Sequence, residues 1–187
     1  RPKYYTSVLD GIKAKVGDEI EILYAEGCKI TEDGDWEATD DVIFSKPEED
    51  KIRIKEAVKT AQQADVVILA IGGNALTSRE AWNENHLGDR PSLELVGSQN
   101  KLVKAMLETG KPVVVLLFNG RPLSINYVNE NVPAILECWY LGQETGGAVT
   151  DILFGEFNPC GKLPISFPRS AGHIPCFIYS KNAFAVS

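Results

Sequence analysis

The segment Asp65-Val-Val-Ile-Leu-Ala-Ile-Gly72 decides the fold class of this chain. Its residues from Val66 to Ile71 are all apolar, so both faces of a strand built from them would be buried. Strands buried on both faces are typical of parallel sheets that carry helices on each side. Residues 112–118 and 134–139 have the same character, and each predicts a further strand of that sheet.

Helical patterns alternate with these strands along the chain. Apolar side chains recur at helical spacing in residues 5–16, 47–61 and 96–109, and shorter helices are expected at 123–129 and 148–154. Residues 19–24 alternate like a strand, and residues 162–167 predict an edge strand because they contain a proline. The pattern predicts an α/β fold, a three-layer α/β/α sandwich with a mostly parallel sheet of about six strands. Residues 1–175 form its single domain and residues 176–187 a loosely patterned tail.

Composition limits the classes of partner. The 187 residues carry a net charge of −7 without a basic cluster, so neither nucleic acid nor an anionic membrane is an expected partner. The apolar runs are too short to span a bilayer. The four cysteines lack the spacing of a metal site, and a disulfide joining Cys160 to Cys28 or to Cys176 stays open.

Common cofactor and nucleophile motifs are missing from the sequence. A dinucleotide-binding turn would require GxGxxG after the first strand, and a phosphate loop GxxxxGK followed by Ser or Thr, yet neither pattern occurs. A GxSxG nucleophile elbow is absent too. We therefore expect no cofactor and no metal.

The long connection that follows Gly72 is the best candidate for a functional site. Loops after the carboxyl ends of parallel strands are where open α/β sheets place their chemistry. Within it, Glu80 and Glu84 are candidate acids, and Trp82 lies close enough in sequence to shield Glu80. A carboxylic acid donates a proton near neutral pH only where burial or a neighbour raises its pKa. The alternative for Glu80 is a structural role, as a solvated loop acid that pairs with a nearby arginine.

The chain resembles the second domain of glycoside hydrolase family 3 from about residue 4 to residue 175. Five stretches carry the resemblance: Thr77-Ser-Arg-Glu-Ala81, Leu87-Gly-Asp-Arg-Pro-Ser-Leu-Glu-Leu-Val-Gly-Ser-Gln99, Thr109-Gly-Lys-Pro-Val-Val-Val-Leu-Leu-Phe-Asn-Gly-Arg-Pro-Leu123, Trp139-Tyr-Leu-Gly-Gln-Glu-Thr-Gly146 and Asp151-Ile-Leu-Phe-Gly-Glu-Phe-Asn-Pro-Cys-Gly-Lys-Leu-Pro-Ile-Ser-Phe-Pro-Arg169. The resemblance implies a retaining, exo-acting glycosidase of β-glucosidase or β-xylosidase type. In that family a (β/α)₈ barrel supplies an aspartate nucleophile and this domain supplies a glutamate acid/base.

By its position in the first of these motifs, Glu80 matches the acid/base glutamate. Many relatives carry glycine on both sides of that residue, where Arg79 and Ala81 stand here, and the spacer that follows is long. Glu84 therefore stays as an alternative proton donor. Trp82, His86 and Arg90 are candidates for contact with a leaving-group sugar, by stacking or hydrogen bonding, and loop packing is the alternative role, preferred for Arg90.

No stretch of these residues resembles the barrel, so we expect the polypeptide to hold half of an active site and to be inactive alone. Its expected partners are a β-linked glycoside or oligosaccharide and the barrel domain of the same polypeptide. The alternative is a stand-alone carbohydrate-binding or interaction module without catalysis. The compartment stays open, with a periplasmic or extracellular location slightly favoured for the parent enzyme.

Overall fold

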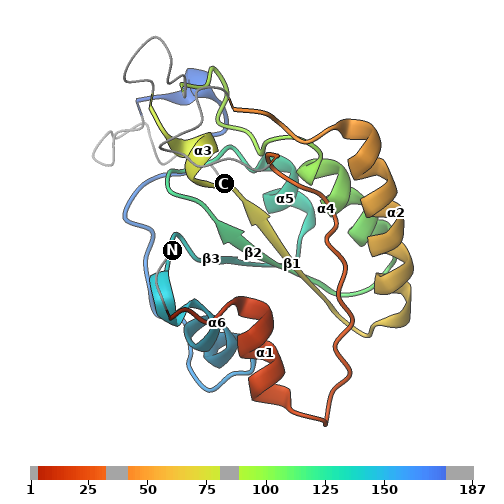
Figure 1. The fold of residues 1–187 in the computed structure, drawn as a ribbon. Helices are drawn as coiled ribbons and strands as arrows, with labels where there is room; N and C mark the ends of the chain where they lie inside the picture. Colours follow the sequence, from red (N-terminus) through yellow and green to blue (C-terminus); the bar gives the residue numbers. More distant parts are fainter. Residues whose placement is uncertain (1–3, 33–41, 81–88, 176–187) are drawn as a thin grey trace.

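The computed structural model describes residues 4–32, 42–80 and 89–175, and these form an α/β fold around a parallel sheet (Figure 1). The sheet has three strands in the order β1-β2-β3. Their bounds are Val67–Gly72, Val113–Phe118 and Ala134–Glu137. Val67 pairs with Val113 and Val115 with Ile135, so the carboxyl ends of all three strands lie at one edge of the sheet.

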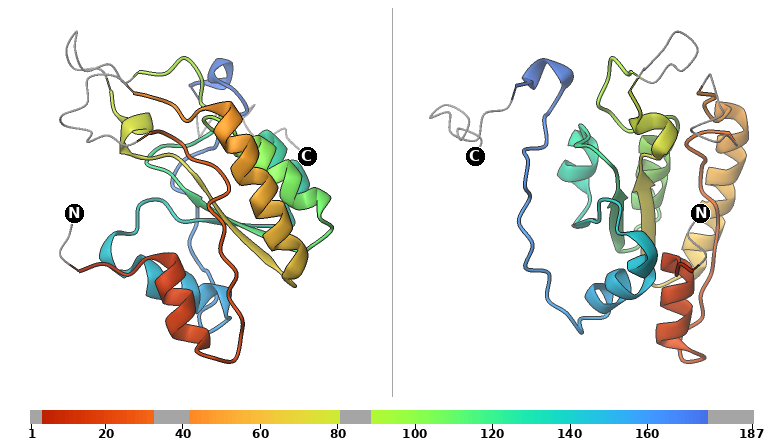
Figure 2. Two further views of the ribbon diagram at one scale, coloured as in Figure 1. Left: turned by 45° about the vertical axis from the view of Figure 1, so that its right-hand side comes forward. Right: turned by 60° about the vertical axis from the view of Figure 1, so that its left-hand side comes forward.

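Helices cover both faces of the sheet (Figures 1 and 2). One face carries α2 (Pro47–Gln63), α4 (Gln99–Glu108) and α5 (Asn126–Asn131). The other face carries α1 (Val8–Val16) and α6 (Thr145–Leu153), which pack on each other. Short helical turns complete the described elements: α3 (Ala75–Ser78), the 3₁₀ turn Gly142–Glu144 before α6, and the 3₁₀ turn Ala171–His173.

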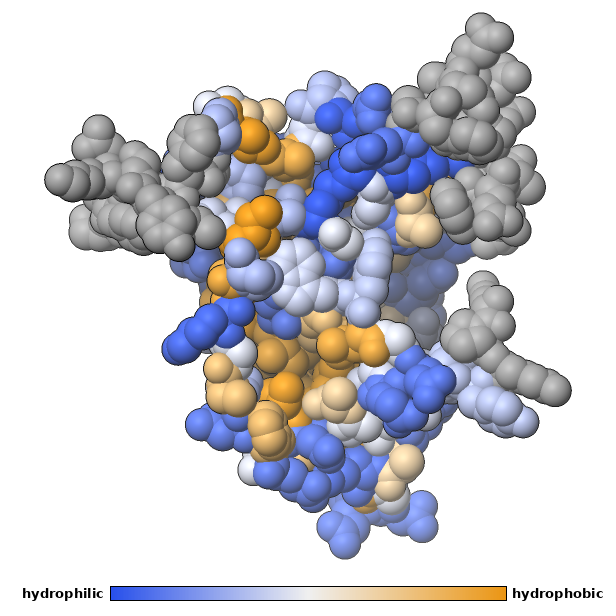
Figure 3. Space-filling view, turned by 90° about the vertical axis from the view of Figure 1, so that its left-hand side faces the viewer, coloured by the Kyte–Doolittle hydropathy of each residue, from blue (hydrophilic) through white to orange (hydrophobic). Residues whose placement is uncertain are grey.

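The two faces are packed to different degrees. On the α2/α4/α5 face, the main core takes side chains from β1, β2 and all three helices, among them Ile71, Val103, Val115, Leu117 and Val128. The core on the α1/α6 face has only three fully buried members, Leu116, Cys138 and Val149. Ala70 is exposed on that side, and the side of the molecule seen in Figure 3 shows apolar surface gathered in a hollow of its lower half.

The helix ends follow from local sequence. Pro47 opens α2 with three acidic residues in its first turn, where the positive end of the helix dipole favours them. Ser7 caps α1 by accepting a hydrogen bond from the Asp10 N–H. Gly110, at φ +74°, follows α4 and donates its N–H to the carbonyl of Leu107.

The fold class is confirmed as α/β, whereas the strand count differs from the prediction of about six. In the described residues, 19–24 and 162–167 form no strand. At the end of the second segment, Phe167 packs against the main core, and the carbonyl of the next residue, Pro168, accepts a hydrogen bond from Ser124 Oγ over 2.9 Å. Alternation predicts which face of a segment is buried, but pairing requires a neighbouring strand.

Cys28, Cys138 and Cys160 carry free thiols, so no disulfide joins Cys28 to Cys160. Cys176 lies outside the described residues. Cys138 is buried at the end of β3, as expected for a small apolar side chain. Across the described part of the chain, no helix has the length and hydropathy needed to cross a bilayer.

Candidate active site

Two glycines shape the carboxyl end of β1. Gly72 has φ +140°, and a Cβ atom added there would lie 1.8 Å from the carbonyl oxygen of Phe118. The next residue, Gly73, donates its N–H to that same carbonyl over 2.7 Å. Only glycine permits so close an approach between the end of β1 and the end of β2.

The side chain of Gln99 fixes this turn from the start of α4. Its Oε1 accepts a hydrogen bond from the Gly72 N–H at 2.7 Å, and its Nε2 donates to the Gly72 carbonyl at 2.9 Å. The same Nε2 also donates to the carbonyl of Val96. Gln99 is only 1% exposed, so it supplies in the interior the two hydrogen bonds that a neighbouring strand would otherwise give Gly72.

Helix α3 places Glu80 directly beyond this turn. Asn74 caps the helix: its Oδ1 accepts from the Thr77 N–H, while Thr77 Oγ1 accepts from the Asn74 N–H, each over 3.0 Å. Asn74 also donates through Nδ2 to Thr31 Oγ1 at 2.7 Å. Arg79 is buried and Glu80, the next residue, is exposed. The backbone before Glu80 is therefore anchored. The Glu80 side chain itself is exposed to groups outside the described chain.

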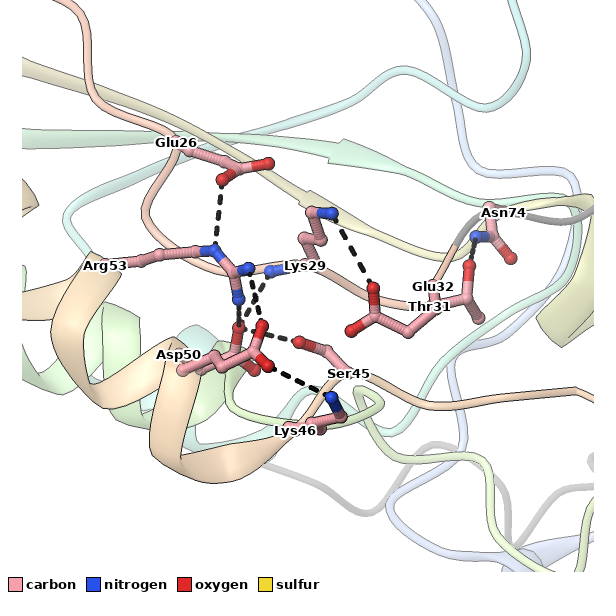
Figure 4. Close-up of polar contacts among 10 residues, drawn as sticks. Glu26, Lys29, Thr31, Glu32, Ser45, Lys46, Asp50, Arg53 and Asn74 are labelled. Carbon is pink, nitrogen blue, oxygen red and sulfur yellow. Dashed lines mark hydrogen bonds and ion pairs between the residues drawn. The ribbon is translucent and has the colours of Figure 1, made fainter.

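A buried ionic cluster anchors the chain that leads to Thr31 (Figure 4). Asp50 of α2 is fully buried and accepts hydrogen bonds from the Lys29 N–H, from Ser45 Oγ and from Arg53 Nη1 at 2.8–3.1 Å. Arg53 also contacts Glu26 through Nε at 3.1 Å. Burial alone would raise the pKa of Asp50, but these donors outweigh it and hold the pKa below its usual value.

The remaining predicted site residues divide into two groups. Trp82, Glu84 and His86 lie in residues 81–88, outside the described residues. Arg90 is half-buried, and its Nη2 donates to the carbonyl of Glu94 over 2.7 Å. Burial, together with the nearby charge of Arg121, lowers the pKa of Arg90. The contact with Glu94 favours loop packing over sugar contact as the role of Arg90.

The structure adds Glu137, at the end of β3, to the polar groups at this edge of the sheet. Its Oε1 accepts from the Trp139 N–H at 3.0 Å, while Oε2 is buried without a hydrogen-bond partner among the described residues. Burial raises the pKa of Glu137 to about 7. Its side chain borders a cavity of about 430 Å³ that Leu117, Leu123 and Phe167 also line. The sequence signal that could have identified Glu137 is its position as the single carboxylate in the apolar segment 134–139.

Metal ligands do not assemble among these groups. In the ranges that the structure describes, no set of three or more His, Cys, Asp or Glu side chains is placed to hold a metal ion. Among the described groups, the Glu80 side chain is exposed and the Glu137 side chain is half-buried, and the charge of Arg121 acts on Arg90.

Comparison with known proteins identifies the domain. Residues 1–186 match the model of the glycosyl hydrolase family 3 C-terminal domain. The chain belongs to this family. The resemblance found in the sequence motifs is thereby confirmed, and the parallel sheet with its anchored β1 loop is this chain's version of the family 3 C-terminal domain.

Named relatives of this family 3 domain are β-xylosidases and β-glucosidases. The chain is 47% identical over 174 residues to a beta-xylosidase of Formosa agariphila, and the match covers 93% of the chain and 21% of that protein. It is 42% identical over 180 residues to a periplasmic beta-glucosidase of Salmonella typhimurium, covering 94% of the chain and 23% of the relative. The chain thus spans about a fifth of the length of these curated relatives.

A solved structure has the same fold as this family 3 domain. The β-glucosidase EmGH1 of Erythrobacter marinus superimposes with a TM-score of 0.89 at 41% sequence identity. The match covers 96% of this chain and 25% of EmGH1. Nearly all of the chain therefore corresponds to one part of a multidomain protein.

Proposed function

We propose that this family 3 domain supplies Glu80 as the general acid/base of a retaining, exo-acting β-glycosidase. The observation that carries the proposal is the position of Glu80: its backbone follows an anchored turn at the carboxyl end of β1, and its side chain is exposed. The carboxylate nucleophile would come from a (β/α)₈ barrel elsewhere in the same polypeptide. The active site would then be shared between two domains.

The reaction runs in two steps through a glycosyl-enzyme intermediate. In the first step the nucleophile attacks the anomeric carbon, the glycosidic C–O bond breaks, and Glu80 gives its proton to the departing oxygen. In the second step the ionised Glu80 takes a proton from water, whose oxygen attacks the anomeric carbon and displaces the nucleophile. The product keeps the β configuration, and Glu80 ends the cycle protonated.

The exposure of Glu80 supports a shared site. A general acid acts best with a pKa close to the working pH, and a water-excluded surrounding is the usual means of raising the pKa of a glutamate. The apolar cover would then come from the barrel and from the bound sugar. Trp82 and His86 are proposed to contact the leaving-group sugar, because they follow Glu80 in the same loop.

The substrate class follows from the relatives. The relatives named above are a β-xylosidase and β-glucosidases, and a β-glucosidase of Listeria innocua with 31% identity has been solved in complex with gluconolactone and with glucose. We propose a β-glucoside or β-xyloside as the substrate of the parent enzyme. The sugar that reacts would be held chiefly by the barrel.

The direct test replaces each candidate acid in the full-length parent enzyme. Glu80→Gln keeps the size of the side chain but cannot transfer a proton, so kcat for an alkyl β-glucoside should fall by about 10²–10⁴-fold. Glu84→Gln is the matched control and should keep most of the activity. A full loss in Glu84→Gln together with an active Glu80→Gln would assign the role to Glu84 and overturn the proposal.

The chain by itself should lack activity, because one of the two carboxylates is missing from it. Purified residues 1–187 should release no nitrophenol from nitrophenyl β-glucoside or nitrophenyl β-xyloside above the uncatalysed rate. Turnover by these residues that Glu80→Gln abolishes would show that a complete site lies within them.

A further inference from the structure

Tyr140 lies at the carboxyl edge of the sheet and contacts the loops that follow the other two strands. It is the third residue after β3, which ends at Glu137. Its hydroxyl lies 3.3 Å from Ser78 Oγ in α3, the helix that follows β1. Its ring contacts Gly120, which follows β2, since a Cβ atom added to Gly120 would lie 2.7 Å from Tyr140 Cε2. The Tyr140 side chain therefore reaches from the end of β3 across the end of β2 to the loop after β1.

The backbone that leads into Tyr140 is strained at Trp139. Trp139 has φ +50°, a left-handed conformation that bulky residues rarely adopt, and within the described ranges every other residue with positive φ is a glycine. Its N–H donates to Glu137 Oε1 over 3.0 Å, and its ring packs against that of Phe167 with the centroids 5.8 Å apart. Such strain persists only where surrounding contacts enforce it, and it is concentrated at functional sites. The packing thus holds the turn into Tyr140 against its own conformational preference.

The turn that supports the Tyr140 ring is itself fixed. Asn119, at the end of β2, is only 1% exposed, and its Nδ2 donates to the carbonyl of Arg121 over 2.8 Å. This contact closes the turn around Gly120. Because Gly120 has no Cβ, the aromatic ring can approach its backbone closely. Tyr140 therefore lies against a fixed turn after β2 and touches the anchored α3 turn after β1.

Despite these contacts, much of the Tyr140 side chain remains open to a ligand. The side chain is 53% exposed, and its contact with Ser78 is an exposed one that adds little to stability. A tyrosine ring combines an apolar face with a polar hydroxyl. A pyranose ring matches this chemistry, because it carries an apolar face of C–H groups and a rim of hydroxyls. Single exposed aromatic side chains are common on protein surfaces, so the position of Tyr140 relative to Glu80 decides its role.

Tyr140 lies close to the place where the leaving group of the proposed reaction departs. Ser78 precedes Glu80 by two residues, so the Cα atoms of Ser78 and Glu80 are at most about 7 Å apart. Glu80 gives its proton to the glycosidic oxygen, and the departing sugar keeps that oxygen. The departing sugar must therefore lie next to Glu80, within reach of an aromatic ring whose hydroxyl touches Ser78.

We infer that the exposed part of the Tyr140 ring stacks on the leaving-group sugar of an oligosaccharide substrate. The contact favours β-linked disaccharides and longer chains over glycosides with a small leaving group. The inference rests on the proposed function, because it requires Glu80 at the bond that breaks. Tyr140 approaches the sugar from the segment after β3, whereas Trp82 and His86 follow Glu80 in the loop after β1. The leaving-group sugar is thereby bound from two separate loops of this domain.

A comparison of two leaving groups in the full-length parent enzyme tests the contact. Cellobiose releases a sugar, whereas methyl β-glucoside releases methanol, which is too small to reach Tyr140; xylobiose and methyl β-xyloside replace them if the parent is a xylosidase. Tyr140→Ala should lower kcat/KM for the disaccharide by about tenfold, as expected for one lost aromatic contact, and for the methyl glycoside by less than about twofold. Tyr140→Phe keeps the ring and should retain most of the preference. Phe157→Ala removes an aromatic side chain of similar exposure, 56%, beyond α6 and should leave the preference unchanged.

Two further variants separate this contact from other causes. Gly120→Ala keeps Tyr140 but forces its ring to move, so it should lower the preference for the disaccharide in the same direction, and it decides the test if Tyr140→Ala does not fold. Glu80→Gln should lower kcat for both substrates together, because both leaving groups need a proton; an active Glu80→Gln would contradict the acid/base role separately. A preference in Tyr140→Ala within about twofold of the native value would overturn the inference. Equal losses on both substrates would overturn it as well, because Tyr140 would then act by supporting the turn before Glu80.

Discussion

The ends of β1 and β3 lie at the same edge of the sheet, yet the carboxylates near them differ in burial: Glu80 is exposed, whereas Glu137 is half-buried. At the end of β1, Gln99 satisfies the backbone of Gly72 and Asn74 caps α3, while Glu80 beyond them is exposed. At the end of β3, Glu137 is half-buried, one of its oxygens is unbonded among the described residues, and its pKa is raised to about 7.

The difference separates two requirements of a proton donor. The chain fixes the backbone that precedes Glu80 but leaves the carboxyl uncovered, so the surroundings that would tune it come from outside. The chain itself tunes Glu137 by burial, but the Glu137 carboxyl borders a cavity that the structure assigns to no reaction. The two carboxylates thus differ in what this chain provides: an anchored and exposed position for Glu80, and a raised pKa for Glu137.

The largest effect on the β1 side is expected from Gly72→Ala. The added Cβ would meet the Phe118 carbonyl at 1.8 Å, so β1 and β2 must separate at their carboxyl ends. We expect a loss of about 3–5 kcal/mol in the free energy of unfolding, measured by urea denaturation. Gly147→Ala, in α6 with no atom near the added Cβ, should cost nothing, because alanine favours a helix.

Gln99→Leu should have the next largest effect. It keeps an apolar stem of similar size but leaves the N–H and carbonyl of Gly72 and the carbonyl of Val96 without their buried partner. The expected loss is about 2–4 kcal/mol of unfolding free energy, also from urea denaturation. Asn100→Leu, one residue further along and exposed, should change stability by less than about 0.5 kcal/mol. Equal losses in the two variants would mean that the turn after β1 is not fixed by Gln99.

On the β3 side, Glu137→Gln should alter the pH dependence of stability. The folded-state pKa of Glu137 is raised to about 7, so folding favours the protonated form. Its contribution is intact below the unfolded pKa of about 4.3 and declines as pH rises through about 7. Glutamine cannot ionise, so the variant should gain about 1–2 kcal/mol over the native chain at pH 8 and nearly nothing at pH 4. A difference that is the same at both pH values would contradict the raised pKa.

The smallest effect is expected from Ser78→Ala. Its hydroxyl lies 3.3 Å from the hydroxyl of Tyr140, an exposed contact that links the α3 turn to the segment after β3. Water competes for the groups of an exposed hydrogen bond, so the free energy of unfolding should change by less than about 0.5 kcal/mol. A much larger loss of unfolding free energy, seen equally in Tyr140→Phe, would show that the α3 turn and the segment after β3 stabilise each other.

Sequence periodicity was sufficient for elements that contribute side chains to the main core. The strands at residues 67–72 and 113–118 and the helix from Pro47 were all predicted within a few residues of their bounds. The prediction was wrong for residues 19–24 and 162–167 as strands of the described sheet. Periodicity reports the face that a segment would bury, but a strand also needs an adjacent backbone, and the sequence of one segment cannot show whether that backbone is present.

The site was predictable only in part. The family motif predicts Glu80 as the acid/base, and that role stays a prediction; the position of its loop after β1 was expected from general properties of parallel sheets. The double hydrogen bond of Gln99 to Gly72 was not predictable, because Gln99 and Gly72 lie 27 residues apart and no periodic pattern links them. The raised pKa of Glu137 depends on its burial beside a cavity that Phe167 also lines, and the sequence predicted the segment of Phe167 as an edge strand instead.

The role of Glu80 is tested most directly in the full-length enzyme, by how the rate of the Glu80→Gln variant depends on the leaving group of the substrate. Proton donation matters for an alkyl β-glucoside and far less for a dinitrophenyl β-glucoside, whose leaving group departs without a proton. We predict that the glycosylation step falls by about 10²–10⁴-fold for the alkyl substrate and is nearly unchanged for the dinitrophenyl substrate. Azide, which attacks without needing a base, should restore turnover and yield the β-glucosyl azide. Equal losses on both substrates, with no azide product, would contradict Glu80 as the acid/base.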